Sequence, residues 1–98
     1  MNIHQEKNGT ALVISPEGRL DTMTAPAFEE TLKTAMEGVE TLTFDFEKLD
    51  YISSAGLRVL LAAQKTMNRQ GSMKVTHVNE IISEIFEVTG FSDILTIE

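Results

Sequence analysis

The stretch LTFDFEKLDYISSAGLRVLL, residues 42–61, decides the fold, because the spacing of its hydrophobic residues changes along its length. Hydrophobic and polar residues alternate from Leu42 to Phe46, which predicts a strand with one buried face. A turn is expected at Glu47 to Asp50. From Ser54 the hydrophobic spacing becomes helical, and this pattern ends between Asn68 and Gly71. A strand followed by a helix is the building unit of α/β proteins.

The residues before this stretch predict a hairpin and a first helix. Asn8-Gly9 is a two-residue hairpin signal, so Ile3–Lys7 and Ala11–Ser15 are expected to pair as strands. The helix that follows is expected to take Thr24 as its N-cap and to carry Pro26 in its first turn.

The residues after it predict a strand from Met73 to Val78, a helix from the cap Asn79 to Gly90, and a short last strand from Ile94 to Ile97. The complete order is β-β-α-β-α-β-α-β. The expected fold class is therefore α/β, with a four- to five-stranded, mainly parallel sheet, an N-terminal edge hairpin strand and three or more helices. The crossovers are expected to be right-handed.

Composition narrows the classes of function. The 98 residues suffice for a single domain, residues 1–98, and the absence of cysteine excludes disulfides and thiolate metal sites. A polar N-terminus and the lack of a long apolar run predict a cytoplasmic protein. The net charge of −7 repels phosphate backbones and anionic lipids, so neither a nucleic acid nor a membrane is expected as a direct partner.

Enzymatic motifs are absent from the sequence. His4 and His77 lie far apart, with no carboxylate or cysteine at metal-ligand spacing, so both are interpreted as structural or solvent-facing and no metal site is expected. There is no Walker-type phosphate loop and no G-x-S-x-G elbow. We therefore expect a protein without catalytic residues and without a cofactor.

Two hydroxyl groups, those of Ser53 and Ser54, stand where a loop enters the second helix. A helix N-terminus favours an anion or a phosphorylated side chain, because its amides are free and its dipole is positive there. The local sequence favours a simpler interpretation, in which Ser54 is an N-cap. Gly56 in the first turn costs about 1 kcal/mol relative to alanine, which indicates a close approach to the backbone at that point.

Asp21 follows a strand that ends at Leu20. The loops beyond the carboxyl ends of parallel strands form the functional edge of an open sheet, so Asp21 is expected near Ser54. An equally supported interpretation makes Asp21 a local turn or cap for the stretch from Thr22 to Ala25.

Several of these segments resemble one family. The matching segments are Gly18-Arg19-Leu20-Asp21 with Thr24-Ala25, Phe44-Asp45-Phe46, Asp50-Tyr51-Ile52-Ser53-Ser54-Ala55-Gly56-Leu57, and Phe86-Glu87-Val88-Thr89-Gly90-Phe91. In order and spacing they are similar to the STAS-domain anti-sigma factor antagonists, over nearly the whole chain. The resemblance implies a STAS fold and a bacterial regulator of transcription that works by partner switching.

The resemblance also implies a phosphorylation site. In that family the serine two residues before the Gly-Leu pair is phosphorylated by the partner, an anti-sigma factor that is a serine kinase, and a metal-dependent serine phosphatase reverses the step. The match falls on Ser54, with Ser53 as a second candidate acceptor. Ser53 stands where some members carry an acidic residue, while Ala55 and Arg58 replace a hydroxyl and a glycine.

The expected partner surface combines the loop after Leu20 with the first turns of the second helix. Its residues are Asp21, Thr22, Met23, Thr24, Ser53, Ser54, Ala55, Gly56, Leu57 and Arg58. Two other functions stay open at this point. One is a STAS module that regulates an anion transporter or serves as a scaffold without serine phosphorylation, and the other is a small enzyme or nucleotide-binding protein.

Overall fold

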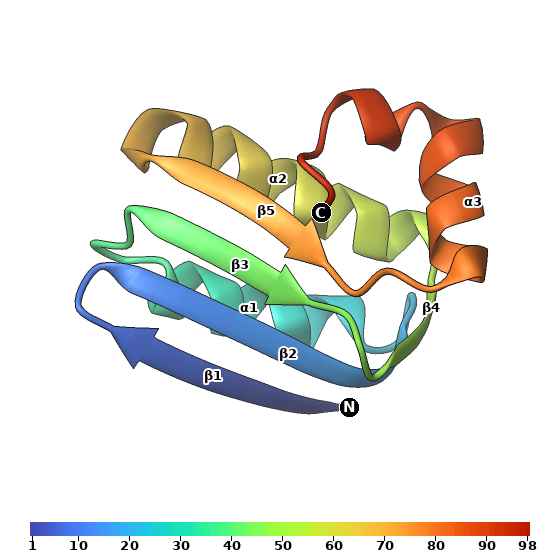
Figure 1. Ribbon diagram of the computed structural model, residues 1–98. Coiled ribbons are helices and arrows are strands. Elements are labelled where there is room, and N and C mark those ends of the chain that lie inside the picture. The colour runs from blue at the N-terminus through green and yellow to red at the C-terminus, as the bar shows by residue number, and fades with distance from the viewer.

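A computed structural model, which describes residues 1–98, shows one five-stranded sheet and three α-helices (Figure 1). The strands are β1 (Asn2–Asn8), β2 (Ala11–Leu20), β3 (Thr41–Asp45), β4 (Leu49–Ile52) and β5 (Ser72–Thr76). The helices are α1 (Ala25–Ala35), α2 (Ser54–Gln70) and α3 (Glu80–Thr89), and a 3₁₀-helix, η1, covers Phe91–Asp93.

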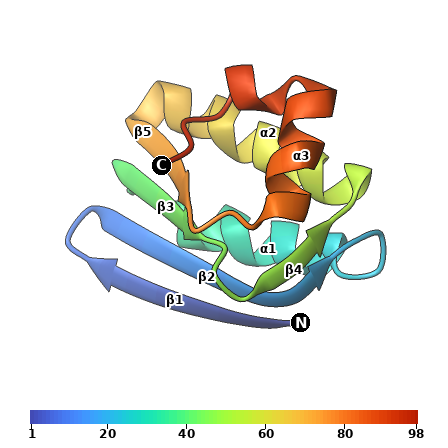
Figure 2. The ribbon, with the colours of Figure 1, turned by 45° about the vertical axis from the view of Figure 1, so that its right-hand side comes forward.

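The sheet divides at the middle of β2. Four strands lie in the order β1-β2-β3-β5, with β1 antiparallel to β2 and the other pairs parallel. The first half of β2 pairs with β3, whereas its last residues pair with β4 after a register shift between Gly18 and Arg19. β4 therefore extends the sheet only at the carboxyl end of β2 (Figure 2).

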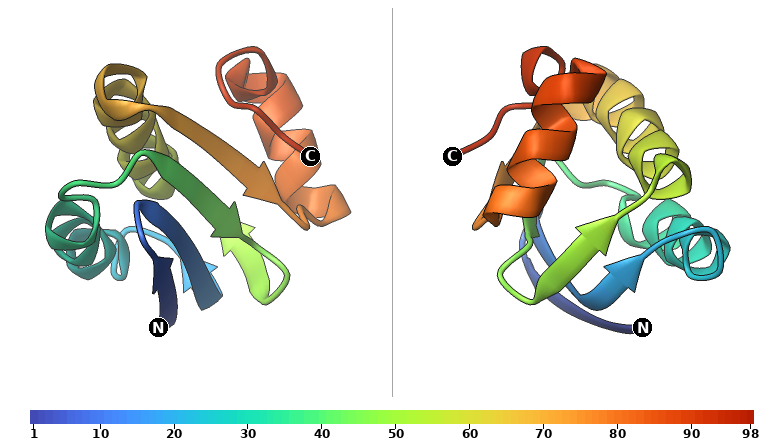
Figure 3. Two further views of the ribbon diagram at one scale, coloured as in Figure 1. Left: turned by 60° about the vertical axis from the view of Figure 1, so that its left-hand side comes forward. Right: turned by 90° about the vertical axis from the view of Figure 1, so that its right-hand side faces the viewer.

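The hydrophobic core lies between the sheet and the helices α1 and α2. Phe44 of β3 stands between Phe28 of α1 and Phe46, with ring centroids 6.1 Å and 5.8 Å away. Both helices cover the same face of the sheet, while α3 stands beyond the tip of β5 and contacts β4 (Figures 1 and 3). The opposite face carries polar, partly exposed side chains such as Ser15, Thr43 and Lys74.

Both ends of α3 follow their sequence signals, whereas the start of α1 does not. The Asn79 side chain accepts a hydrogen bond from the Ile82 N–H at 2.8 Å, and Gly90 ends α3 in the left-handed conformation, as expected. Thr24 occupies the N-cap position of α1, but its hydroxyl does not cap the helix. No helix in the structure is long and hydrophobic enough to cross a lipid bilayer.

The expected fold class is confirmed, and the order of elements differs from the prediction in two places. The expected turn at Glu47 to Asp50 is shorter, because Leu49 already begins β4 beside β2. The expected last strand from Ile94 to Ile97 is reduced to one bridge between Ile97 and Val75. Residues 91–93 coil into a 3₁₀ turn and Ile94 keeps a helical conformation, so the chain meets β5 only where Val75 bonds to the Thr96 carbonyl and the Glu98 N–H.

Candidate functional site

Parallel pairing of β2 and β4 brings the Asp21 loop to the start of α2. Leu20 lies opposite Ile52, and the Ser53 N–H donates a hydrogen bond to the Leu20 carbonyl at 2.9 Å. The chain therefore leaves both strands at the same edge of the sheet, where α1 and α2 begin (Figure 3, right). Asp21 and Ser54 sit on adjacent segments there.

The Asp21 side chain organises a tight turn. Its Oδ1 accepts hydrogen bonds from the Met23 and Thr24 amides at 3.0 and 3.2 Å. The Thr24 hydroxyl donates to the Arg19 carbonyl at 2.8 Å and accepts from the Asp21 N–H at 2.9 Å. These contacts fit the interpretation of Asp21 as a local turn residue.

Electrostatics favour the charged form of Asp21. The pKa of its carboxyl lies below the usual value, chiefly because the Thr24 backbone N–H donates to it. The Met23 N–H and the Arg19 guanidinium 3.8 Å away add to this lowering, while desolvation opposes it. Asp21 is therefore a fixed negative charge beside the start of α2.

The turn displays an apolar side chain at its tip. Met23 is 87% exposed, although its backbone N–H is held by Asp21. Thr22 is exposed as well, and the Arg19 guanidinium lies 4.5 Å from the centre of the Tyr51 ring on the flank of the turn. Single exposed hydrophobic side chains are common on protein surfaces, so Met23 shapes the tip of the turn but does not by itself mark a docking site.

The two serines have opposite environments. Ser53 is the N-cap residue of α2, in an extended conformation, and its hydroxyl oxygen is buried without a hydrogen-bond partner. Ser54 is the first residue of the helix and is exposed. The interpretation of Ser54 as an N-cap is therefore wrong. No side chain caps α2, and its first turn contains no acidic residue.

Gly56 is required by packing within the protein. A Cβ atom at this position would lie 2.7 Å from Ile52 Cγ1 and 2.8 Å from Leu20 Cγ. The close approach that the sequence indicated is thus made by the strand ends, which press against the first turn of α2. The adjacent Leu57 is also buried, at 6% exposure.

These environments correct the expected partner surface. Gly56 and Leu57 face the core and offer no surface to a partner. The exposed members are Thr22, Met23, Ser54 and Arg58, and the partly exposed ones are Asp21, Thr24, Ser53 and Ala55.

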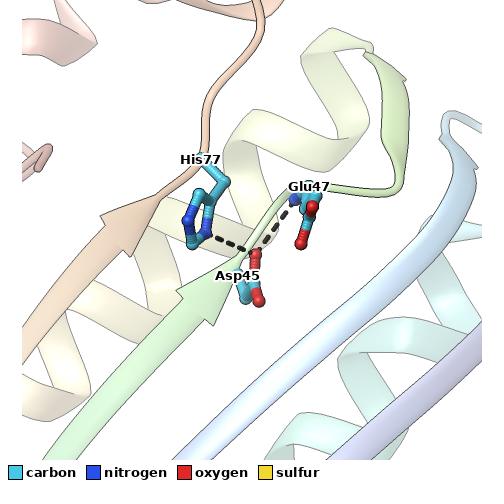
Figure 4. Close-up of side chains that lie close together, drawn as sticks. All are labelled: Asp45, Glu47 and His77. Atoms are coloured by element: carbon cyan, nitrogen blue, oxygen red, sulfur yellow. Dashed lines mark hydrogen bonds and ion pairs between the residues drawn. The ribbon is translucent and has the colours of Figure 1, made fainter.

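A second polar cluster was missed by the sequence reasoning. His77 Nδ1 lies 2.9 Å from Asp45 Oδ1, and the Glu47 N–H donates to the same oxygen at 3.1 Å (Figure 4). His4 likewise lies 2.6 Å from Glu17. Both histidines are exposed, as expected, and their carboxylate neighbours are distant in the sequence. Strand pairing brings Glu17 to His4 across the antiparallel β1 and β2, and Asp45 to His77 across the parallel β3 and β5. The sequence offered one signal for this contact. If the predicted strands around Phe44 and Val75 pair in parallel, Asp45 and His77 come to the same edge of the sheet.

Comparison with known proteins identifies the family. The family model described as STAS domain matches residues 2–98. The chain belongs to the STAS domain family. The anti-sigma-B factor antagonist of Listeria monocytogenes is 31% identical to this STAS chain, over 96% of the chain and 84% of that protein. The anti-sigma-B factor antagonist of Bacillus subtilis is 28% identical, over 99% and 90%.

A solved structure shares the fold of this STAS protein. It is that of the Bacillus cell fate determinant SpoIIAA in the phosphorylated form, with a TM-score of 0.76 at 19% identity. The alignment covers 99% of this chain and 91% of that one. The STAS fold expected from the sequence is thus confirmed.

Proposed function

We propose that this STAS protein is an anti-sigma factor antagonist. In this proposal it binds a kinase-type anti-sigma factor when unphosphorylated and is released when Ser54 is phosphorylated. The observation that carries the proposal is the exposed hydroxyl of Ser54 at the first position of α2, beside a neighbour, Ser53, whose hydroxyl is buried. Relatives named as anti-sigma-B factor antagonists, and a fold neighbour in a phosphorylated form, support it.

The fold is expected to tolerate a phosphate on Ser54. Phosphorylation adds about −1.5 to −2 charge at pH 7. A helix N-terminus stabilises a negative charge by roughly 0.3–1 kcal/mol, and no acidic side chain in the first turn of α2 opposes it. Arg58 is exposed four residues further on, so it lies on the same face of the helix and offers a counter-charge.

The phosphate is expected to act on binding instead. A partner that packs over Ser54 and the exposed Met23 would have to bury a dianion, which is costly without a matched cation. The fixed charge of Asp21 adds to the negative potential at this edge. A hundredfold loss of affinity requires only about 2.8 kcal/mol, which is within the range of one buried, unpaired charge.

The first test maps the modification. The full chain is incubated with ATP and a purified candidate kinase-type anti-sigma factor, and its intact mass and modified peptide are measured. We expect one phosphate on Ser54, none in Ser54→Ala, and normal phosphorylation of Ser53→Ala. A phosphate on Ser53, or on neither serine, would contradict the assignment. A metal-dependent serine phosphatase is expected to remove it.

The second test measures affinity for the same partner by calorimetry. Ser54→Ala is expected to bind like the unmodified protein, and Ser54→Glu is expected to bind about a hundredfold more weakly. Ser83→Glu is the matched control, because Ser83 is an exposed serine on a different helix. Equal affinity of the two Ser54 variants would refute the switch and would favour a regulatory or scaffold module without serine phosphorylation.

A further inference from the structure

A histidine and two carboxylates converge at the carboxyl ends of β3 and β5, apart from the Ser54 site. Asp45 is the last residue of β3, Glu47 lies in the turn after it, and His77 follows β5. One ligand atom from each side chain lies within 4.8 Å of the other two (Figure 4). The proposed partner switching does not use these residues.

The backbone explains why the three side chains meet. Asp45 lies opposite Thr76 in the parallel pairing of β3 and β5, so the next residue, His77, emerges beside it. His77 has a φ of 57°, which is unusual for a residue other than glycine. The Glu47 N–H donates to Asp45 and fixes the turn that brings Glu47 to the same place.

The donor set fits a transition-metal ion. One imidazole nitrogen and two carboxylate oxygens suit divalent ions of the Zn²⁺ type, which bind nitrogen and oxygen ligands at about 2.0–2.2 Å. All three side chains are at least partly exposed, so small rotations can draw the ligand atoms together. We propose that Asp45, Glu47 and His77 form a binding site for a divalent transition-metal ion, completed by water.

The surroundings leave space for that water. A hollow of about 310 Å³ adjoins Asp45 and Glu47. His4, Ser15 and Lys48 complete its lining, which contains no hydrophobic residue and does not include His77. Three protein ligands with open remaining positions are the arrangement of accessible metal sites, whereas closed structural zinc sites use four protein ligands. Lys48 also lines the hollow, so its ammonium group opposes a bound cation.

The protein contains its own control. His4 Nε2 lies 2.6 Å from Glu17 on the neighbouring strands, which is also a contact between a histidine and a carboxylate. That pair is not part of any group of three ligands. His4 lines the same hollow as Asp45 and Glu47, so comparing His4→Asn with His77→Asn tests which of the two histidines is the metal ligand.

The test uses the full chain and ZnCl₂ alone, with affinity and stoichiometry from calorimetry and with Co²⁺ absorption as a spectroscopic readout. We expect one ion per chain. His77→Asn, Asp45→Asn and Glu47→Gln should each weaken Zn²⁺ binding about tenfold or more. Asparagine tolerates a positive φ, so His77→Asn should keep the fold, which circular dichroism checks. His4→Asn should bind like the parent, and Lys48→Gln should bind more tightly.

Two results would overturn the metal site. One is the absence of saturable Zn²⁺ binding, and the other is binding that falls as much in His4→Asn as in His77→Asn. Neither result bears on phosphorylation of Ser54, so the metal site and the proposed switch are tested separately.

Discussion

The helices α2 and α3 both begin next to β4, yet a side chain caps the first turn of α3 and none caps that of α2. Asn79 caps α3 by accepting from the Ile82 N–H, and its side-chain amide donates to the Leu49 carbonyl at 3.0 Å. Ser53 holds the equivalent position in α2 but makes no capping hydrogen bond. In the first turn of α3 a side chain therefore occupies a backbone amide, whereas in the first turn of α2 no capping side chain does so.

Whether a side chain caps the first turn decides whether the backbone amides there are already bonded or are free to bind a ligand. A cap satisfies amides that would otherwise bind water or an anion. Packing through Gly56, and not a cap, fixes the start of α2 in this protein. In the proposed switch, a phosphate on the exposed Ser54 would therefore not break a contact on which the helix depends.

The largest effect on stability is expected from Gly56→Ala. Alanine is a better helix former by about 1 kcal/mol, so an uncrowded position would be stabilised. Here the new methyl group would lie 2.7 and 2.8 Å from side-chain carbons of Ile52 and Leu20, and 3.0 Å from the Leu20 carbonyl oxygen. Overpacking against backbone takes the upper end of the usual cost, about 3 kcal/mol, so the expected net loss is about 2 kcal/mol. Urea denaturation should show a net loss. A gain in stability would mean that the start of α2 is not held by packing.

A smaller loss is expected from Asn79→Ala. The substitution removes the cap of α3, worth about 1 kcal/mol, together with the hydrogen bond to the Leu49 carbonyl. The unfolding free energy should fall by about 1–2 kcal/mol in denaturant titrations. Asn79→Asp keeps the oxygen that accepts from the Ile82 N–H but loses the amide that donates to the Leu49 carbonyl. An intermediate loss of unfolding free energy in this variant would separate the contribution of the cap from that of the second hydrogen bond.

The smallest change, and one of opposite sign, is expected from Ser53→Ala. A serine at an N-cap normally stabilises a helix, so its removal should be costly. Ser53 Oγ is buried without a partner, and removing such an atom relieves a desolvation penalty of up to about 1 kcal/mol. The variant should be as stable as the parent or slightly more stable. A loss of 1 kcal/mol or more would show that α2 is capped in solution after all.

Local patterns predicted most of the fold. The alternation of hydrophobic and polar residues predicted β3, and Asn8-Gly9 predicted the hairpin of β1 and β2. The helical spacing of hydrophobic residues between Asn79 and Gly90 predicted α3. β4 was missed because it has only four residues and follows a charged turn. It pairs with β2 after the register shift between Gly18 and Arg19, and the local sign of that shift is a glycine within the strand, Gly18, with a φ of 97°.

The candidate site was predictable only in part. The order of strands and helices indicates that the Asp21 loop and Ser54 share an edge, because parallel strands end together. The sequence does not reveal which serine is exposed, because this depends on how the first turn of α2 packs against Leu20 and Ile52. The contact between His77 and Asp45 requires the register of β3 and β5, which join residues 32 positions apart.

The turn built by Asp21 has a consequence for the kinetics and entropy of association. Loops that become ordered on binding lose conformational entropy, at about 0.5–1.5 kcal/mol for each immobilised flexible side chain. The backbone around Met23 is already tied down before any encounter, by hydrogen bonds to both Asp21 and Arg19. A partner that binds this edge, as proposed, would therefore meet an already ordered turn, and changes in its residence time would report the charge at this edge more than any rearrangement of the chain.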